Sequence, residues 1–295
     1  DLGFLSAKDA LDSSGIDKET LDYIIVAHNF GDVVFGSNRS DLVPSLASRV
    51  KYMLGIENPG CVAYDLPFGC PGWVEGLIQA NYFIRSGDVK RCLVIGAETL
   101  SRVVDPSDRD TMLFSDGSGA VILEALESEA PARKQRGILA HKTRTYAGEH
   151  AMLLKMGGSN APERHGSGNI FLKMNGRKVY EFALSQVPLV IKEALDMAGV
   201  HITEIKKVLI HQANDKMDAA ILERLFRLYG CENCDAALMP MTISWLGNTS
   251  VATIPTLLDL IMKGKFKDQH LSPGDTVIIS SVGAGMNVNA LIYRF

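Results

Sequence analysis

The amino-acid sequence predicts an α/β protein built from two similar halves. Three observations support this expectation. Short apolar runs typical of buried strands alternate with longer segments of helical spacing. The order of these segments in the first half is repeated in the second, and the intervals between corresponding runs are nearly the same. In a duplicated fold of this kind, loops at equivalent strand ends can meet at one site.

Length and composition allow such a fold and exclude some classes of function. The 295 residues, 46% of them hydrophobic, can bury a large core. A net charge of −4 without a basic tract argues against a nucleic-acid partner, and no apolar run is long enough to span a membrane. Five scattered cysteines indicate a reducing, cytoplasmic setting. The first residue is Asp1 and not Met, so we expect that an N-terminal segment is absent from this sequence.

The first half is expected to contain four strands and three helices. Apolar runs bounded by turn residues predict the strands, and apolar positions at helical spacing predict the helices. The strands cover residues 21–28, 61–65, 91–97 and 119–125, and the helices cover residues 3–13, 43–53 and 73–86. Segment 29–42, rich in Gly, Asn, Ser and Asp, is predicted to be a surface loop, and residues 99–118 to be a second loop.

The second half repeats this order after an irregular junction. Residues 126–170, with a charge run at 132–136, are expected to be the least ordered part of the chain. A solvated linker and a flap over an active site would share this composition. A long amphipathic helix is predicted from Asn175 to Met197, ending before Gly199. We divide the chain into halves of residues 1–140 and 141–295.

Residues 65–73, DLPFGCPGW, are predicted to form the end of a strand, a tight elbow and the start of a helix. Pro71 suits the first helical turn. Unpaired N–H groups and the helix dipole at a helix start lower a cysteine pKa toward the thiolate form. Cys70 is therefore a candidate nucleophile. The alternative is that Cys70 is a small buried apolar residue, as most free cysteines are.

Two polar residues of the second half fall at corresponding positions. His211 follows the apolar run VLI, and Asn248 lies in LGNTS. A thiolate can attack a thioester, while imidazole and amide N–H groups stabilise negative charge that develops on oxygen. Separately, each residue could be a hydrogen-bonded core residue or a turn residue. Their joint placement with Cys70 in a duplicated fold favours a catalytic site.

Six segments of the chain, in register from its start to its end, resemble the β-ketoacyl-acyl carrier protein synthase III family of the thiolase superfamily. They are FGCPG, DPSDRDTMLFSDGSGAVIL, MNGRKVYEFA, HQAN, GNTSVATIP and SVGAGMN. The resemblance implies a thiolase-like duplicated five-layer αβαβα fold, a homodimer, and no metal, flavin or nucleotide cofactor. The family's N-terminal strand and the segment after it have no counterpart here.

The resemblance also implies an activity, the initiating decarboxylative Claisen condensation of fatty acid biosynthesis. Cys70 would take an acyl group from an acyl-CoA, and a malonyl-acyl carrier protein would lose CO2 and attack that acyl group. His211 and Asn248 match the family's two decarboxylation and condensation residues. The backbone N–H groups of Cys70 and Gly285 match its oxyanion hole.

Other matches concern the protein surface. Arg109 matches an arginine that stacks on the CoA adenine, and Lys216 matches an arginine that docks the acidic acyl carrier protein. Both could instead be solvated charges. A buried stripe is predicted on helix 216–228, formed by Met217, Ile221, Leu225 and Leu228. Cys231 and Cys234 form a CxxC without a partner pair, so no metal site is predicted there.

Departures from the family pattern leave the acyl specificity and the pathway open. Segment 29–42 is longer than usual, Leu42 and Val43 lie nearest to the family's interface-crossing residue, and Phe68 replaces a small residue. One alternative is a related acyltransferase of a secondary pathway with a different acceptor. A catalytically silent partner subunit is disfavoured because all three candidate residues are present. A degradative thiolase is disfavoured because SVGAGMN contains no cysteine.

Overall fold

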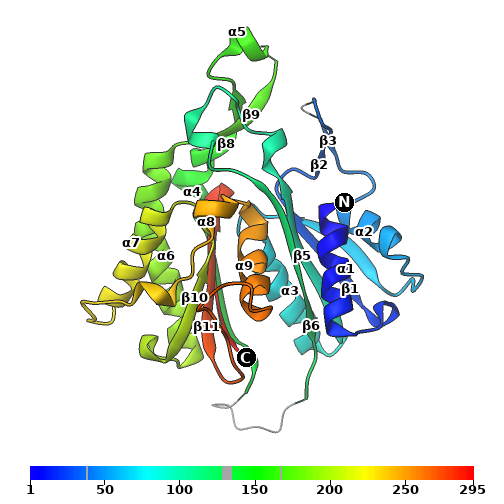
Figure 1. Cartoon of the computed structure of the whole chain (residues 1–295), viewed down its shortest axis with the longest axis vertical. Helices are drawn as coiled ribbons and strands as arrows, with labels where there is room; N and C mark the ends of the chain where they lie inside the picture. Colours follow the sequence, from blue (N-terminus) through cyan, green and yellow to red (C-terminus); the bar gives the residue numbers. More distant parts are fainter. Residues whose placement is uncertain (38, 128–134, 167) are drawn as a thin grey trace.

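Two four-stranded sheets and the helices around them form five layers (Figure 1). The computed structural model describes residues 1–37, 39–127, 135–166 and 168–295. Helices α1 (Leu2–Ser14) and α2 (Leu46–Leu54) cover the outer face of the first sheet. Helix α6 (Gly176–Ala198) covers the outer face of the second, with α7 (Asp215–Arg227) packed beside it. Helices α3 (Gly72–Ser86) and α9 (Thr253–Met262) lie between the sheets, which confirms the predicted αβαβα order.

The two sheets have related but unequal topologies. The strand order is β4-β1-β5-β6 in the first sheet and β10-β11-β12-β7 in the second. In the first sheet only β6 is antiparallel to its neighbour, whereas in the second only β10 and β11 are parallel. The strands of the first sheet are β1 (Tyr23–His28), β4 (Val62–Pro67), β5 (Arg91–Thr99) and β6 (Asp116–Glu124). Those of the second are β7 (Gly137–Thr145), β10 (Ile205–Ile210), β11 (Thr276–Gly283) and β12 (Asn287–Arg294). The expected boundary at residues 140 and 141 falls within β7, which pairs with β12 of the second sheet.

The layer between the sheets fixes the position of α3. Trp73 is 1% exposed and donates its indole N–H to the Val94 carbonyl at 3.3 Å. Burying an apolar side chain of this size contributes about 2–3 kcal/mol. Helix α3 also approaches the sheet closely, because Gly76 has no side chain and a Cβ atom there would stand 2.8 Å from Val94 Cγ1. The start of α3, where the cysteine elbow lies, is therefore held by a tightly packed core.

The junction after the first sheet is more ordered than predicted. Residues 126–170 contain β7, most of a hairpin of β8 (Leu154–Gly158) and β9 (Ile170–Met174), and the short helices α4 (Ala147–His150) and α5 (Pro162–His165). The expectation of the least ordered segment missed these strands. They are largely half-buried and lack the long apolar runs that mark a strand in a sequence. Residues 132–134 of the predicted charge run lie outside the described residues. The hairpin and α5 project beyond the layers at the top of Figure 1.

A second short hairpin lies within the segment predicted to be a loop. Strands β2 (Asp32–Val33) and β3 (Ser40–Asp41) pair there. The remaining helical segments each have three or four residues. They are η1 (Lys18–Thr20), η2 (Leu100–Arg102), η3 (Arg109–Thr111), η5 (Ala151–Leu153), η6 (Ile202–Glu204), η7 (Ala236–Leu238), α8 (Ile243–Leu246), η8 (Ser250–Ala252) and η9 (Ala284–Met286).

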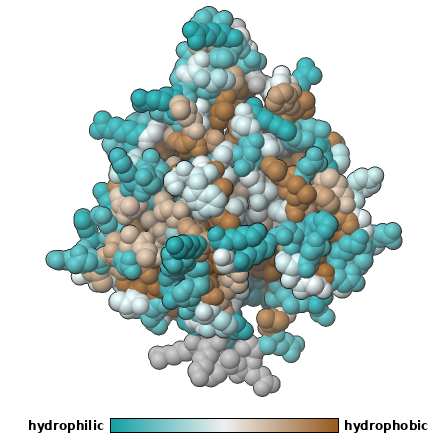
Figure 2. Space-filling view, in the orientation of Figure 1, coloured by the Kyte–Doolittle hydropathy of each residue, from teal (hydrophilic) through white to brown (hydrophobic). Residues whose placement is uncertain are grey.

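Hydrophobic side chains on the face shown in Figure 2 lie in separate patches among hydrophilic ones. Across the described part of the chain, none of the helices combines the length and the apolar character that crossing a membrane requires.

Candidate active site

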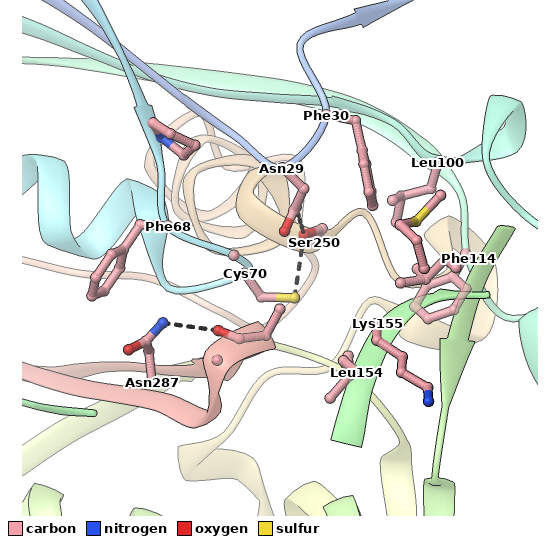
Figure 3. A pocket seen from close by; sticks show the side chains of 16 residues that line it. Asn29, Phe30, Phe68, Cys70, Leu100, Phe114, Leu154, Lys155, Ser250 and Asn287 are labelled. Carbon is pink, nitrogen blue, oxygen red and sulfur yellow. Dashed lines mark hydrogen bonds between the residues drawn. The ribbon is translucent and has the colours of Figure 1, made fainter. Parts of the chain in front are cut away.

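Cys70 lies in the turn between β4 and α3, so the predicted strand, elbow and helix are confirmed. Strand β4 ends at Pro67 and α3 begins at Gly72. The turn requires glycine at position 69, where φ is +66° and a Cβ atom would stand 3.0 Å from the backbone nitrogen of Ala284. Cys70 lines a cavity of about 360 Å³ (Figure 3). The elbow therefore presents the thiol to a space that can hold a small ligand.

The environment of Cys70 does not lower its pKa, which corrects the expectation from the helix start. Burial raises the pKa of the thiol to about 11. The hydroxyl of Ser250, which donates to the sulfur at 3.2 Å, acts in the opposite direction, while the charge of Glu98 raises the pKa further. Cys70 also precedes the helix and its N-cap, Pro71, so it stands outside the first turn. Desolvation outweighs the helix terminus here.

The C-terminal glycine loop covers the cysteine. A Cβ atom on Gly283 would stand 2.6 Å from the backbone nitrogen of Cys70, so only glycine permits this approach. Gly285 follows with φ +76° and lines the same cavity as Cys70. Asn287 fixes the loop by donating from Nδ2 to the Ala284 carbonyl at 2.8 Å. The structure thus brings together the two residues whose N–H groups were predicted to form an oxyanion hole.

His211 and Asn248 are both buried and converge on Ser250. Burial lowers the pKa of His211 to about 4, and its imidazole contacts the Ser250 backbone. Asn248 Oδ1 accepts a hydrogen bond from the Ser250 N–H at 2.9 Å. Ser250 in turn donates its hydroxyl to Cys70. Neither His211 nor Asn248 contributes to the walls of the cavity that Cys70 lines, so Ser250 connects the three predicted residues.

Sequence reasoning missed three polar residues at this site, namely Ser250, Asn29 and Glu98. The Asn29 side chain donates to Ser250 Oγ at 2.9 Å, and its backbone N–H donates to Glu98 Oε2 at 2.8 Å. One signal was present in the sequence. Asn29 follows the strand of DYIIVAHN, which has the same strand-then-polar pattern as VLIHQAN around His211. Glu98 is likewise a charged residue in the last part of an apolar run.

The rest of the cavity wall is largely apolar and includes the β8–β9 hairpin. Its hydrophobic residues are Phe30, Pro67, Phe68, Leu100, Phe114, Leu154, Met156, Leu172 and Ala284. Lys173 ties the hairpin to the loop beside it through ion pairs with Asp105 at 2.5 Å and Asp108 at 3.0 Å. Burial alone would raise the pKa of Asp105, but the Lys173 ammonium and the Asn160 backbone N–H hold it well below its usual range. Of the two interpretations of this segment, the flap fits better, because β8 and β9 form part of the cavity.

The residues predicted for surface contacts do not line this cavity. The side chain of Arg109 is 91% exposed, and Lys216 is exposed at the start of α7. Met217, Ile221 and Leu225 are buried as predicted. Leu228 is 41% exposed, so its place in the buried stripe is wrong; α7 ends at Arg227, one residue before it.

The second cysteine motif does not form a metal centre in this structure. Cys231 and Cys234 are free and partly exposed. Within the described ranges, no group of three or more His, Cys, Asp or Glu side chains could hold a metal ion.

Comparisons with known proteins agree with this geometry. Residues 64–145 match the family model described as 3-oxoacyl-[acyl-carrier-protein (ACP)] synthase III, and residues 195–295 match that of its C-terminal part. The chain is 36% identical to beta-ketoacyl-[acyl-carrier-protein] synthase III 1 of Vibrio vulnificus over 100% of this chain and 84% of the relative. It is 37% identical to the synthase III of Streptococcus pneumoniae over 99% and 83% of the two chains.

Solved structures give the same result. The crystal structure of 3-oxoacyl-[acyl-carrier-protein] synthase III from Aquifex aeolicus is 31% identical, with a TM-score of 0.78 over 99% of this chain and 83% of that chain. The corresponding enzyme of Pseudomonas aeruginosa is 28% identical, with a TM-score of 0.81 over 100% and 82%.

The duplicated five-layer fold and the cysteine elbow beneath a glycine loop define a thiolase-like condensing enzyme, which is an acyltransferase. The family models and the relatives extend this assignment over nearly the whole chain. The chain belongs to the 3-oxoacyl-[acyl-carrier-protein] synthase III family.

Proposed function

We propose that this enzyme joins an acyl group, carried on Cys70 after transfer from an acyl-CoA, to malonyl-acyl carrier protein, and so initiates fatty acid biosynthesis. The observation that carries the proposal is the position of Cys70, which opens into an apolar cavity beside Gly285. The family to which the chain belongs gives the same reaction class.

The first half-reaction is the transfer of the acyl group. The Cys70 sulfur attacks the thioester carbonyl of the acyl-CoA, and CoA leaves as a thiol with the proton that Cys70 loses. We assign the backbone N–H groups of Cys70 and Gly285 to the carbonyl oxygen, to which they donate as it becomes negative. One donor of this kind typically contributes about 3 kcal/mol to transition-state stabilisation. The raised thiol pKa means that such stabilisation has to compensate for a small thiolate fraction.

The second half-reaction is the condensation. The malonyl group loses CO2 and becomes an enolate, whose carbon attacks the acyl-enzyme; Cys70 leaves and recovers a proton. His211 is neutral at neutral pH because its pKa is about 4. Asn248 uses its Oδ1 to accept from Ser250, which leaves its NH2 group to act as a donor. We assign to His211 and Asn248 the role of neutral hydrogen-bond donors to the enolate oxygen, for which the His211 imidazole has to exchange its contact with the Ser250 backbone.

The proposed partners are assigned to residues on the surface of the molecule. We assign the CoA adenine to Arg109 and the acyl carrier protein to Lys216, since both side chains are exposed cations. Strand β4 is at the edge of the first sheet, and most of its residues are only half-buried. A second copy pairing along β4 would bury this edge, which supports a homodimer. We place the enzyme in the cytoplasm and assign it no cofactor, no nucleic-acid partner and no membrane partner.

The decisive experiment is acylation of the purified protein with acyl-CoAs of increasing chain length, followed by intact mass measurement. Cys70→Ala is the control. A mass gain confined to short acyl groups and absent from Cys70→Ala supports the proposal. A mass gain only with long or unusual acyl groups would indicate that the enzyme belongs to a secondary pathway. No gain that depends on Cys70 would contradict priming by acyl-CoA.

A further inference from the structure

Three polar side chains lead from the first sheet to the sulfur of Cys70, namely Glu98, Asn29 and Ser250. Figure 3 shows the last two of them beside Cys70. Glu98, near the end of β5, is 3% exposed and accepts the backbone N–H of Asn29 at 2.8 Å. The Asn29 side chain donates from Nδ2 both to Glu98 Oε2 and to Ser250 Oγ. Ser250 Oγ then donates to Cys70 Sγ at 3.2 Å. These contacts join residues of both halves in one chain of hydrogen bonds.

The direction of each hydrogen bond is fixed from the Glu98 end. The carboxylate oxygen Oε2 accepts the backbone N–H of Asn29, so the side-chain group that faces the same oxygen has to be a donor. The Asn29 amide therefore turns its NH2 group toward both Glu98 and Ser250. Because Ser250 Oγ accepts from Asn29, its own proton is directed to the sulfur.

The backbone of Ser250 is held in place independently. Its φ of 53° lies in the left-handed region, which non-glycine residues rarely adopt. The Ser250 N–H donates to Asn248 Oδ1 at 2.9 Å, which fixes this conformation from within the same loop. Only the hydroxyl proton remains free to rotate, and Asn29 is the group that determines its direction.

We propose that Asn29 and Glu98 are positioning residues for the nucleophile, which hold the Ser250 hydroxyl as a hydrogen-bond donor to the Cys70 sulfur. The inference rests on the proposed role of Cys70. A donor to sulfur stabilises the thiolate more than the thiol, so the network favours the reactive form of a cysteine that burial disfavours. Asn29 and Glu98 do not touch the sulfur and act only through Ser250.

The network is tested by the rate at which iodoacetamide alkylates Cys70 between pH 7 and 9, read on the peptide that contains Cys70. In this range the rate follows the thiolate fraction. Ser250→Ala and Asn29→Ala are each expected to lower the rate about tenfold at every pH, since each removes the donor to sulfur or its orientation. The double variant is expected to be no slower than the slower single variant, because Asn29 acts through Ser250.

Two outcomes would overturn the inference. If the effects of the two substitutions multiply, Asn29 acts by another route. If Asn29→Ala speeds alkylation, its role is to pack the site, because loosening exposes the thiol. Thr253→Ala is the matched control: it removes a buried hydroxyl, 3.2 Å from Thr249 Oγ1, that belongs to none of these contacts. Its alkylation rate should equal that of the wild type.

Two substitutions separate the anchoring role of Glu98 from the effect of its charge on the thiol. Burial raises the pKa of Glu98 to about 7, and the titratable groups that face it are His28 and Cys70. Glu98→Gln keeps an oxygen to accept from Asn29 but removes the charge that opposes the thiolate. Its Cys70 should be alkylated at most about twofold faster than in the wild type at pH 7, where Glu98 is about half ionised, and by a larger factor at pH 9, where Glu98 is fully charged. Glu98→Ala removes the group that accepts from Asn29, so its Cys70 should be alkylated as slowly as in Asn29→Ala. An alkylation rate equal to that of the wild type would refute the anchoring role.

These readings are independent of acyl transfer. Alkylation requires no acyl-CoA or carrier protein, so an enzyme that accepts no acyl-CoA but shows the expected alkylation rates would keep the inference and lose the proposed substrate. Normal acylation together with unchanged alkylation in all variants would do the reverse.

Discussion

Corresponding strands of the two halves end at a histidine, but the two histidines have different surroundings. His28 is the last residue of β1, and His211 directly follows β10; both are 2% exposed. His28 Nδ1 accepts the Gly31 N–H at 2.9 Å, and its Nε2 lies 3.1 Å from an oxygen of Asp65. His211 Nδ1 has no hydrogen-bond partner among the described residues. This difference supports a structural role for His28 and the proposed catalytic role for His211.

The difference lies in what each histidine faces. Asp65 also accepts the backbone N–H groups of Leu46 and Ala47 at 2.8 Å each, so it links His28 to the first turn of α2. This arrangement fastens a helix to the first sheet. Among the residues that the structure describes, no carboxylate pairs with His211, whose pKa burial lowers to about 4. The residue type alone does not determine the role; the partner supplied by the neighbouring strand does.

The largest expected effect separates the two histidines by activity. His211→Ala should lower the rate of condensation by about 10²- to 10³-fold, because a donor to the enolate oxygen is lost. Acylation of Cys70 by acyl-CoA should change only a few-fold, since the proposed role of His211 begins after that step. Steady-state condensation and single-turnover mass measurement give the two rates. An equal loss in both would show that His211 serves the nucleophile instead.

The matching substitution in the first half should affect stability. His28→Ala leaves Asp65 without its buried partner, and the free energy of unfolding should fall by about 3 kcal/mol. Denaturant unfolding at pH 7 measures this change. Condensation per folded molecule should stay within about threefold of the wild type. The comparison breaks down if His28→Ala unfolds like the wild type but cannot condense.

The pH dependence of stability offers a third test. The pKa of His211 is about 4 in the folded protein, whereas an unfolded chain has a histidine pKa of about 6.5. The unfolded state therefore binds more protons between these values, so this contribution to stability is present above pH 6.5 and is lost toward pH 4, by up to about 3 kcal/mol. In His211→Asn this contribution should be absent, which unfolding curves at pH 7 and pH 5 would reveal.

Other groups titrate under nearby conditions, so the comparison with the variant is essential. The pKa of Glu98 is raised to about 7 by burial, and its contribution has the opposite sign, since stability is lost as the pH rises through that range. Burial alone would raise the pKa of Asp65, but hydrogen bonds from His28 and the α2 backbone lower it. Its contribution is lost only below about pH 4. Identical curves for wild type and His211→Asn would contradict a buried, neutral His211.

The smallest effects are expected at the surface, for the two exposed cations assigned to partners. These are Arg109 in the first half and Lys216 in the second. Lys216→Ala should lower kcat/KM for malonyl-acyl carrier protein about two- to fivefold, because exposed charges contribute little individually. Its activity with a small malonyl thioester should not change. Arg109→Ala should weaken acyl-CoA use by a similar factor and leave the carrier protein unaffected. Added salt should reduce both differences, and an effect of Lys216→Ala on the small thioester would remove it from the docking surface.

Local signals in the sequence were enough to predict much of this fold. Helix α6 lies between Asn175 and Gly199 as predicted, because its caps and its apolar spacing are contained in one segment. The cysteine elbow was predictable for the same reason. The β8–β9 hairpin was not, since its strands are short, β8 ends in two glycines and only Phe171 and Leu172 of β9 are buried. Its stability comes from ion pairs of Lys173 with a distant loop, which local spacing cannot reveal.

The site was predictable in its principal residues but not in its electrostatics. Cys70 and His211 follow strands β4 and β10, where polar residues after apolar runs mark them, but Asn248 follows the short helix α8, so the expectation of a strand end was wrong for it. The raised pKa of Cys70 depends on burial by segments far away in the sequence, and the nearby helix start predicted the opposite direction. Ser250 went unnoticed because its contact with Cys70 spans 180 residues of sequence.

The distance in sequence between Cys70 and the loops that cover it has a consequence for synthesis of the chain. As the polypeptide leaves the ribosome, the first sheet and its cysteine emerge long before Ser250 and Gly283. Domains generally begin to fold from the N-terminal side during translation. The nascent enzyme therefore carries an uncovered thiol until the second sheet docks, and a brief pulse of a thiol reagent during translation would report the moment at which the two halves close.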